Sequence, residues 1–308
     1  MAVTTPLEIP QFPRRPGLLR VPAFDRLALA LARNRFASLA AVFLLLIVAA
    51  AVLAPLVSPY DPNAQHVLDR LTPPFWQAGG SRDHLLGTDE LGRDVLSRII
   101  WGARTSLTIG IAVVAISVVV GTVTGLLAGY IGGWFDSVMM RIVDIQFSFP
   151  ALLMAMAIVL VLGASARSLI IALSIDGWLV YCRLTRSMAL SLRNTTFIEA
   201  AKSVGCTDAR LLWRHALPNI LSPIVTLGTL EFARIVLAES TLSFLGLGIQ
   251  PPLVSWGLML NNGEDYLTVA WWLITFPGLV LTLTVLSANV VASWLRVASD
   301  PLQRAGVK

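Results

Sequence analysis

Ionisable side chains gather in one short segment, residues 197 to 219, of a chain that is otherwise apolar. Charged residues make up 13% of the 308 residues, whereas hydrophobic residues make up 56%. The ionisable side chains of the segment are Glu199, Lys202, Asp208, Arg210, Arg214 and His215. The histidines of the chain do not stand at the spacing of metal ligands. We therefore interpret this segment as a surface that a partner protein binds.

Capping residues predict a short helix at the beginning of the segment. Thr196 stands three residues before Glu199, which is the spacing of a capping box. A helix that begins there exposes Ala200 and Ala201 on a surface of small residues. Gly205 can adopt the left-handed backbone conformation that ends such a helix.

A second helix is predicted after the glycine. Thr207 and Asp208 can cap it, and Pro218 is expected to interrupt it before the next apolar run. The sequence therefore predicts a helix–glycine–helix hairpin over residues 196–218, a shape that a partner protein can hold and push.

A second set of ionisable residues lies inside apolar stretches: Asp176, Glu231, Arg234 and Glu239. A charge at the centre of a membrane costs about 2.5 to 3.5 kcal/mol on insertion scales, so each needs a partner or a function. Glu231 and Arg234 are three residues apart and are expected to pair on one helix face. For all four, a role in lining or gating a transport pathway is the alternative to a structural one.

Two further groups of charges lie near the ends of apolar stretches. Arg141 and Asp144 are three residues apart and are predicted to pair at the membrane interface. Residues 87–98, GTDELGRDVLSR, contain the acidic and basic residues Asp89, Glu90, Arg93 and Asp94. We expect an outer helix with self-paired charges, and the alternative is a docking site for an extracytoplasmic binding protein.

The sequence does not support catalysis by this chain. Its only lysines are Lys202 and Lys308, and neither stands in the Gly-Lys-Ser/Thr context of a P-loop. It also has no Gly-x-Ser-x-Gly motif. The two cysteines, Cys182 and Cys206, are expected to be reduced thiols. We expect no cofactor and no metal in this chain, and energy for transport must come from a partner or from an ion gradient.

The elements that hold these residues are predicted to be membrane helices. The mean hydropathy is +0.75, and residues 36–57 are 22 uncharged residues. A helix of that length crosses a hydrocarbon core of about 30 Å. The other apolar stretches are 105–135, 145–166, 168–187, 219–248 and 266–295. The predicted fold is an all-α membrane protein with about six transmembrane helices.

Loop charges predict the orientation. Residues 1–35 contain six arginines and two acids, and residues 58–103 contain four arginines and six acids. The N-terminus is therefore expected in the cytoplasm, as are the C-terminus and the hairpin between spans four and five. The predicted divisions are a tail with an amphipathic helix (1–35), a first span (36–57), an outer loop (58–103), a core (104–298) and a C-terminal tail (299–308).

Three glycines predict close helix packing. Gly121, Gly125 and Gly129 recur every four residues, so one helix face has no side chains. We expect a neighbouring helix of the same bundle to lie against this face, and contact with another subunit is the alternative.

The hairpin segment resembles the EAA loop of ATP-binding-cassette (ABC) importer permeases. Its sequence, EAAKSVGCTDARLLWRHALPN, places Glu199, Ala200, Ala201, Gly205, Leu217 and Pro218 at the positions of that motif. The general motif has an apolar residue two positions before the Leu-Pro pair. This sequence has His215 there, which resembles the peptide-transporter branch of the family. Residues 84–107 and 242–260 also resemble segments of C-type permeases of the dipeptide, oligopeptide and nickel family, and the resemblance covers roughly residues 35 to 302.

This resemblance implies a type I importer in the cytoplasmic (inner) membrane. Two homologous permease subunits, usually unlike, would form the pathway, and two ATPase subunits would bind ATP and Mg beneath them. The EAA loop would be the coupling helix, seated on an ATPase, and its coupling residues would include Asp208, Arg210 and Arg214. An extracytoplasmic binding protein would deliver the substrate, and membrane lipid would surround the complex. No nucleic acid partner is implied.

The resemblance favours di- or oligopeptides as substrates. Nickel or glutathione import by a permease of the same family is the nearest alternative, because the binding protein performs much of the selection. A gradient-driven secondary transporter, with Asp176 or Glu239 as ion sites, is an alternative of a different class.

Overall fold

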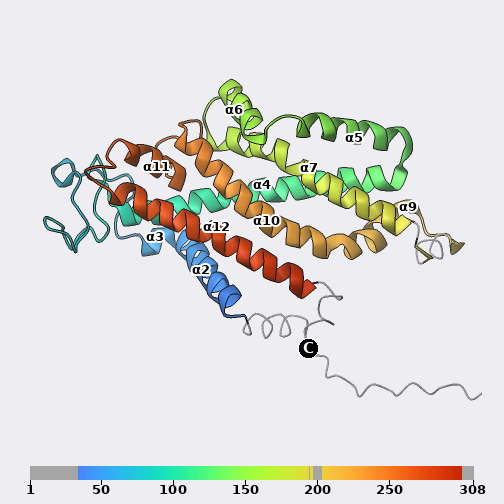
Figure 1. The fold of residues 1–308 in the computed structure, drawn as a ribbon, viewed down its shortest axis with the longest axis horizontal. Helices are drawn as coiled ribbons and strands as arrows, with labels where there is room; N and C mark the ends of the chain where they lie inside the picture. Colours follow the sequence, from blue (N-terminus) through green and yellow to red (C-terminus); the bar gives the residue numbers. More distant parts are fainter. Residues whose placement is uncertain (1–33, 194, 197–202, 300–308) are drawn as a thin grey trace, which may run out of the picture.

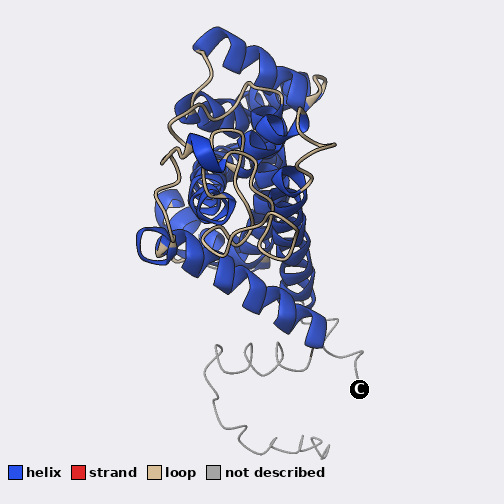
Figure 2. Cartoon of the chain, turned by 90° about the vertical axis from the view of Figure 1, so that its left-hand side faces the viewer, coloured by secondary structure: helices blue, strands red, loops and turns tan. Residues whose placement is uncertain are grey.

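The computed structural model consists of helices joined by loops in the part of the chain that it describes, residues 34–193, 195–196 and 203–299. No strand forms within these ranges, and one isolated bridge joins Thr88 and Asp94 (Figure 2). Five of the helices are long and apolar enough to cross a membrane, and one pair of shorter helices qualifies jointly as a sixth crossing. The prediction of an all-α protein with about six membrane helices is confirmed.

The first membrane helix, α2 (Arg35–Val52), begins where the side chain of Asn34 accepts a hydrogen bond from the backbone N–H of Ala37. A single turn, α3 (Ala54–Val57), follows it and has proline in its first turn. Proline suits that position because its missing N–H would have no partner within the helix. The two helices together occupy the apolar stretch at residues 36–57.

A loop with one short turn, η1 (Val67–Asp69), leads into the longest helix, α4 (Val95–Ile131). The carboxylate of Asp94 caps α4 by accepting a hydrogen bond from the Ser97 N–H at 2.8 Å. Its 37 residues extend over about 55 Å, which exceeds a hydrocarbon core of about 30 Å. The helix begins ten residues before the predicted stretch at 105–135, so it extends beyond the membrane at its first end.

Helix α4 runs parallel to α7 (Ala166–Arg193), and glycines of α4 allow the two backbones to approach each other closely. A methyl group on Gly121 would lie 2.4 Å from the carbonyl oxygen of Trp178, and one on Gly129 would lie 2.7 Å from that of Arg186. The partners advance along α7 as the glycines advance along α4, so both helices run in the same direction. Close packing within the bundle, the first of the two expectations for these glycines, is confirmed.

The predicted third span, residues 145–166, is not one straight helix. It is divided between α5 (Gly133–Phe147) and α6 (Ala151–Leu162), which meet at an angle of 90°. Pro150 stands at the break as the N-cap of α6, with an extended backbone. Its missing N–H cannot continue the hydrogen bonds of α5, and its ring disfavours a helical conformation of the residue before it. Since α4 and α7 are parallel, this pair must return the chain from one end of the bundle to the other (Figure 1). It is one broken crossing.

The second half of the predicted hairpin continues into the next membrane helix without a break. It consists of α9 (Asp208–Arg210), the π-helical segment η2 (Leu211–Ala216) and then α10 (Leu217–Phe244). The prediction that Pro218 interrupts the helix is therefore wrong. The N–H of Leu217 bonds to the carbonyl of Leu212, five residues back, and this wider turn gives room for the proline ring.

The opposite end of the bundle is closed by α11 (Trp256–Glu264), the start of α12 (Trp272–Ser299) and the loop before α4 (Figure 1). Two buried tryptophans fasten these parts together. Trp256 Nε1 donates to the carbonyl of Ile99, and Trp272 Nε1 donates to that of Thr88, both at 3.1 Å.

Candidate functional site

The hairpin segment, residues 196–218, lies between the end of α7 and the start of α10. Residues 197–202, which include Glu199, Ala200 and Ala201, lie outside the described residues. Gly205 has a φ of +83°, and no other group lies within 4 Å of the position that a Cβ would occupy. The predicted left-handed turn is confirmed. Thr207 is the N-cap of α9, as predicted, but its side chain makes no capping hydrogen bond.

One face of the hairpin segment carries exposed apolar and basic side chains. Val204 is 88% exposed and Trp213 is 53% exposed. Arg210 and Arg214 are exposed beside them. Tryptophan and arginine are enriched at protein–protein interfaces. His215 belongs to η2, and its side chain is outside the described part. This face has the composition of a surface that another protein covers.

The other face of the hairpin segment is packed against the membrane helices. Leu212 and Ala216 belong to a buried cluster with Leu126 of α4 and Ala189 of α7. The carboxylate of Asp208 accepts a hydrogen bond from the hydroxyl of Tyr130 at the end of α4. Leu217 and Pro218 form the first turn of α10. The segment is therefore joined rigidly to several helices.

Three of the membrane-embedded charges form one cluster, the charged triad of Asp176, Glu231 and Arg234. The Arg234 guanidinium bonds to Glu231 Oε2 at 2.7 and 2.8 Å and to Asp176 Oδ2 at 2.7 Å. The predicted Glu231–Arg234 pair is confirmed. The link to Asp176 was not predicted, since the two residues are 58 positions apart and sequence spacing gives no signal for contacts between helices. The triad has two negative charges and one positive charge.

Glu239 is separate from the triad and has no exposed surface. Its carboxylate accepts hydrogen bonds from Ser106 Oγ of α4 at 2.9 Å and from Ser243 Oγ at 2.8 Å. Within the described residues no basic side chain pairs with it. In this conformation the carboxyl group joins α4 to α10 and does not face an open path.

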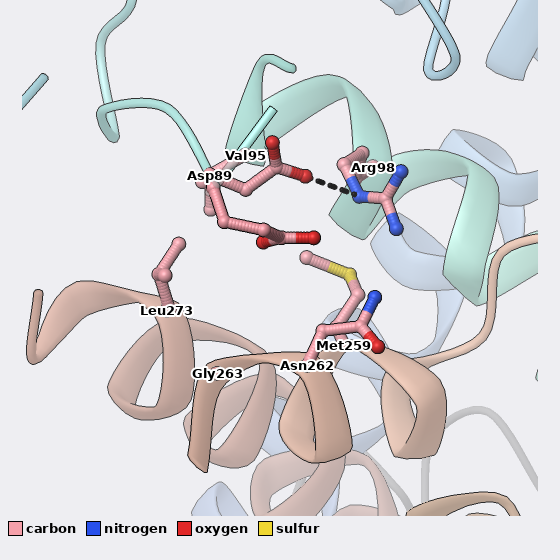
Figure 3. A pocket seen from close by; sticks show the side chains of 8 residues that line it. Asp89, Val95, Arg98, Met259, Asn262, Gly263 and Leu273 are labelled. Atoms are coloured by element: carbon pink, nitrogen blue, oxygen red, sulfur yellow. Dashed lines mark ion pairs between the residues drawn. The ribbon is translucent and has the colours of Figure 1, made fainter. Parts of the chain in front are cut away.

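The outer segment before α4 holds its charges in a compact, self-paired cluster, as predicted. The expected helix is wrong for this part, because Asp89, Glu90 and Arg93 lie in a loop and α4 begins only at Val95. Arg93 bonds to Asp89 and to Glu90, each at 2.6 Å, and Arg98 lies 3.3 Å from Asp89. Figure 3 shows Asp89 and Arg98 facing Met259 and Asn262 across a small hollow. Burial raises the pKa of the Glu90 carboxyl above its usual value, and the negative charge of Asp89 adds to this effect. Asp94 caps α4 and contacts His84 Nδ1 at 3.0 Å.

Two ion pairs join α5 to α7, and the sequence analysis missed both. Asp144 pairs with Arg183 at 2.5 Å, so the predicted pairing with Arg141 is wrong. Arg186 makes a two-pronged pair with Asp136. The acids are eight residues apart and the arginines three apart, so each pair of residues lies on one helix face. The spacings do not match, since eight residues of α5 extend over about 12 Å and three residues of α7 over about 4.5 Å, so the sequence offered no signal for these contacts.

Most of the chain is similar to known transport proteins. The family described as "binding-protein-dependent transport system inner membrane component" matches residues 121–305. The family described as "N-terminal TM domain of oligopeptide transport permease C" matches residues 26–74. The two matches lie on either side of the outer cluster and together include α2, most of the bundle and the hairpin segment.

Three relatives illustrate the similarity. The chain is 44% identical to a di/tripeptide transport system permease protein of Pseudomonas aeruginosa, over 88% of this chain and 89% of that protein. It is 37% identical to a dipeptide transport system permease protein of Haemophilus influenzae, over 87% and 91%. It is 40% identical to a glutathione transport system permease protein of Pectobacterium atrosepticum, over 87% and 88%.

The fold is similar to that of a solved transporter subunit. A chain of the inward-facing MetNI methionine ABC transporter superposes with a TM-score of 0.53 at 17% identity. The superposition covers 66% of this chain and 97% of that chain. At this level of identity the likeness concerns the arrangement of helices.

Proposed function

Because the chain belongs to the binding-protein-dependent transport system inner membrane components, we propose that it is the permease subunit of a di- or oligopeptide importer. The family membership expected from the EAA loop is confirmed, and the chain is a multi-pass protein of the inner membrane. The observation that carries the substrate proposal is the similarity to peptide permeases through almost the whole chain. Energy would come from separate ATPase subunits, which bind ATP and Mg.

The hairpin segment is our candidate for the contact with an ATPase subunit. Its exposed Val204, Trp213 and arginines offer a surface for a partner, and its buried face is continuous with α10. A displacement of this surface would therefore tilt a membrane helix directly. Glu199 and Gly205 are proposed to carry that signal, and a second permease subunit and a binding protein are proposed to complete the complex.

The charged triad is our candidate for the wall of the transport pathway. The Arg234 side chain is 42% exposed, although Asp176 and Glu231 are only 15% and 10% exposed. Contact between a guanidinium and lipid tails at mid-span costs several kcal/mol. The face of α7 and α10 around Arg234 is therefore proposed to meet water or the second permease subunit, not lipid.

Glutathione is the second candidate substrate, because relatives of similar identity are glutathione permeases. Glutathione is itself a small peptide, so the same subunit architecture suits both substrates. Competition experiments distinguish the two substrates. Uptake of labelled substrate by a peptide permease is inhibited by a low concentration of unlabelled dialanine, and uptake by a glutathione permease is inhibited by unlabelled glutathione.

The test of the function is peptide uptake by cells that lack the gene and are complemented with variants. We expect the wild-type chain to restore uptake of radiolabelled dialanine, and depletion of ATP to abolish it at a constant membrane potential. Uptake that persists without ATP and stops with an ionophore would instead show a gradient-driven carrier.

The test of the hairpin segment uses a matched pair of glycines. Gly205 and Gly246 both have positive φ, and both would place a side chain in open space. They lie at opposite ends of α10. We expect Gly205→Asp and Glu199→Arg to abolish peptide uptake and the co-purification of the ATPase subunits with this chain. Gly246→Asp should retain both. Equal behaviour of the two glycine variants would exclude the assigned role.

The test of the pathway wall uses single cysteines and a water-soluble thiol reagent. Leu237 lies one turn beyond Arg234 and is 49% exposed, and Leu45 of α2 is 68% exposed. We expect Leu237→Cys to react in the complex and Leu45→Cys, which faces lipid, to remain unreacted. The reverse pattern would place the pathway elsewhere.

A further inference from the structure

Tyr130 is the last residue but one of α4 and lies at the end of the bundle where the hairpin segment begins and ends (Figure 1). Its hydroxyl donates a hydrogen bond to Asp208 Oδ1, at the start of α9. Its backbone carbonyl accepts a hydrogen bond from Nη1 of Arg193, the last residue of α7, at 3.5 Å. One residue of α4 therefore contacts both chain segments that flank the hairpin turn.

The parts that Tyr130 joins are themselves rigid. Helices α4 and α7 are in backbone contact along their shared glycine face, through Gly121, Gly125 and Gly129. Asp208 begins a helical run that continues through η2 into α10. The Tyr130 ring packs beside the buried cluster that contains Leu212 and Ala216. The hydrogen bond to Asp208 thus links the α4–α7 pair with α10.

We propose that Tyr130 is a positioning residue for energy coupling, which clamps both bases of the hairpin segment to the end of α4. This inference rests on the proposed function. A hydroxyl that donates to a carboxylate forms a charge-assisted bond, which is stronger than a bond between neutral groups. A displacement of the hairpin by a partner ATPase is then transmitted to α4 and α7 as well as to α10.

The clamp should affect the coupling of ATP hydrolysis to transport. Without it, the run that leads into α10 is held to α4 and α7 at this end by the apolar packing of Leu212 and Ala216, which is non-directional. This end of α10 can then shift while the ends of α4 and α7 stay behind. ATP hydrolysis would then proceed without the concerted rearrangement that moves substrate. Loss of the clamp is expected to separate ATP hydrolysis from transport, whereas loss of a purely structural contact would reduce both through lower recovery of the complex.

The experiment measures peptide transported per ATP hydrolysed by the purified, reconstituted complex. Tyr130→Phe keeps the ring and removes only the hydroxyl. Tyr181→Phe is the matched control, because the buried hydroxyl of Tyr181 has no hydrogen-bond partner among the described residues. We expect Tyr130→Phe to lower the transport-to-hydrolysis ratio about tenfold, the factor that a charge-assisted bond present in one state only can supply. Tyr181→Phe should retain the wild-type ratio.

Variants of the partner residue test the same bond from its other side. Asp208→Asn keeps an acceptor oxygen but loses the charge, so it should lower the ratio less than Asp208→Ala, which should lower it as Tyr130→Phe does. The double variant Tyr130→Phe/Asp208→Ala should be no worse than either single variant.

Two results would overturn the clamp: an unchanged ratio in Tyr130→Phe, whether or not recovery of the complex falls, or additive losses in the double variant. A wild-type complex without ATP-dependent peptide uptake would instead contradict the proposed function, and this result is obtained before the variants are compared.

Discussion

Buried ionisable side chains in this protein find their partners on other helices. Glu239 of α10 is held by Ser106 of α4, and Arg234 of α10 is held in part by Asp176 of α7. The sequence identified these residues as costly in a membrane because that depends on residue type alone. It did not identify the partners across helices because those depend on the crossing points of the bundle. Only the Glu231–Arg234 pair, which lies within one helix turn, was predictable.

Removal of the Glu239 carboxyl group is expected to destabilise the bundle. In Glu239→Ala the hydroxyls of Ser106 and Ser243 lose their acceptor inside a buried site, which costs about 1–3 kcal/mol for each unsatisfied group. Glu239→Gln should lose less, because the amide oxygen still accepts one bond. The measurement is the midpoint of thermal unfolding in detergent, with Glu264→Ala, an exposed acid of α11, as control. Equal midpoints for the two alanine variants would contradict the structural role.

Glu90 is expected to make stability depend on pH. Burial and the charge of Asp89 raise its pKa above 4.5 in the folded protein, although Arg93 is bonded to it. The folded state then binds this proton more tightly than the unfolded state, so stability falls as pH rises from 4.5 to the raised value. Glu90→Gln, which cannot ionise, should lose this dependence. Unfolding midpoints between pH 4 and pH 8 measure it, and parallel profiles for the two proteins would refute it.

Helices were predictable here as elements, but their breaks were not. Pro150 and Pro218 both stand in apolar surroundings, yet the helix bends by 90° at the first and continues through the second. The difference lies in the preceding residues: the π-helical segment η2 leads directly into the turn that contains Pro218, whereas α5 ends as an α-helix at Phe147, before Pro150. Leu211 and Leu212 of this π-helical segment are buried, and the spacing of apolar residues in the sequence does not distinguish a π-helical turn from an α-helical one.

The contact between α4 and α7 depends on the absence of side chains on one face. A methyl group at Gly125 would lie 2.3 Å from the carbonyl oxygen of Cys182, whereas one at Gly228 of α10 would find its nearest atom at 3.7 Å. We expect Gly125→Ala to destabilise the protein by about 1–3 kcal/mol through overpacking and Gly228→Ala to be nearly neutral. Thermal unfolding of the two variants in detergent provides the comparison. An unperturbed Gly125→Ala would show that the two helices can separate freely.

At the scale of the whole molecule, the parallel course of α4 and α7 determines which chain ends lie together. The α5–α6 pair must cross back between them, which gives six crossings for the described part. An even number of crossings places the first and last described residues on one side, and Asn34 and Val297 indeed line the same hollow. The hairpin segment lies on that side too, since α4 and α7 both end beside it.

The loop charges predict that this side is the cytoplasmic one, because basic residues are retained in the cytoplasm. The hairpin side carries the basic residues, so Cys206 should react with a membrane-impermeant thiol reagent in inverted vesicles and remain protected in intact spheroplasts. Cys182 is buried and should not react. For the opposite side, Arg82→Cys in a Cys206→Ser background should show the reverse pattern. Three crossings, α4, the α5–α6 pair and α7, lie between Arg82 and Cys206, so the two positions must be on opposite faces. Labelling of both from the same side would refute the crossing count, and a reversed pattern for both would refute the orientation.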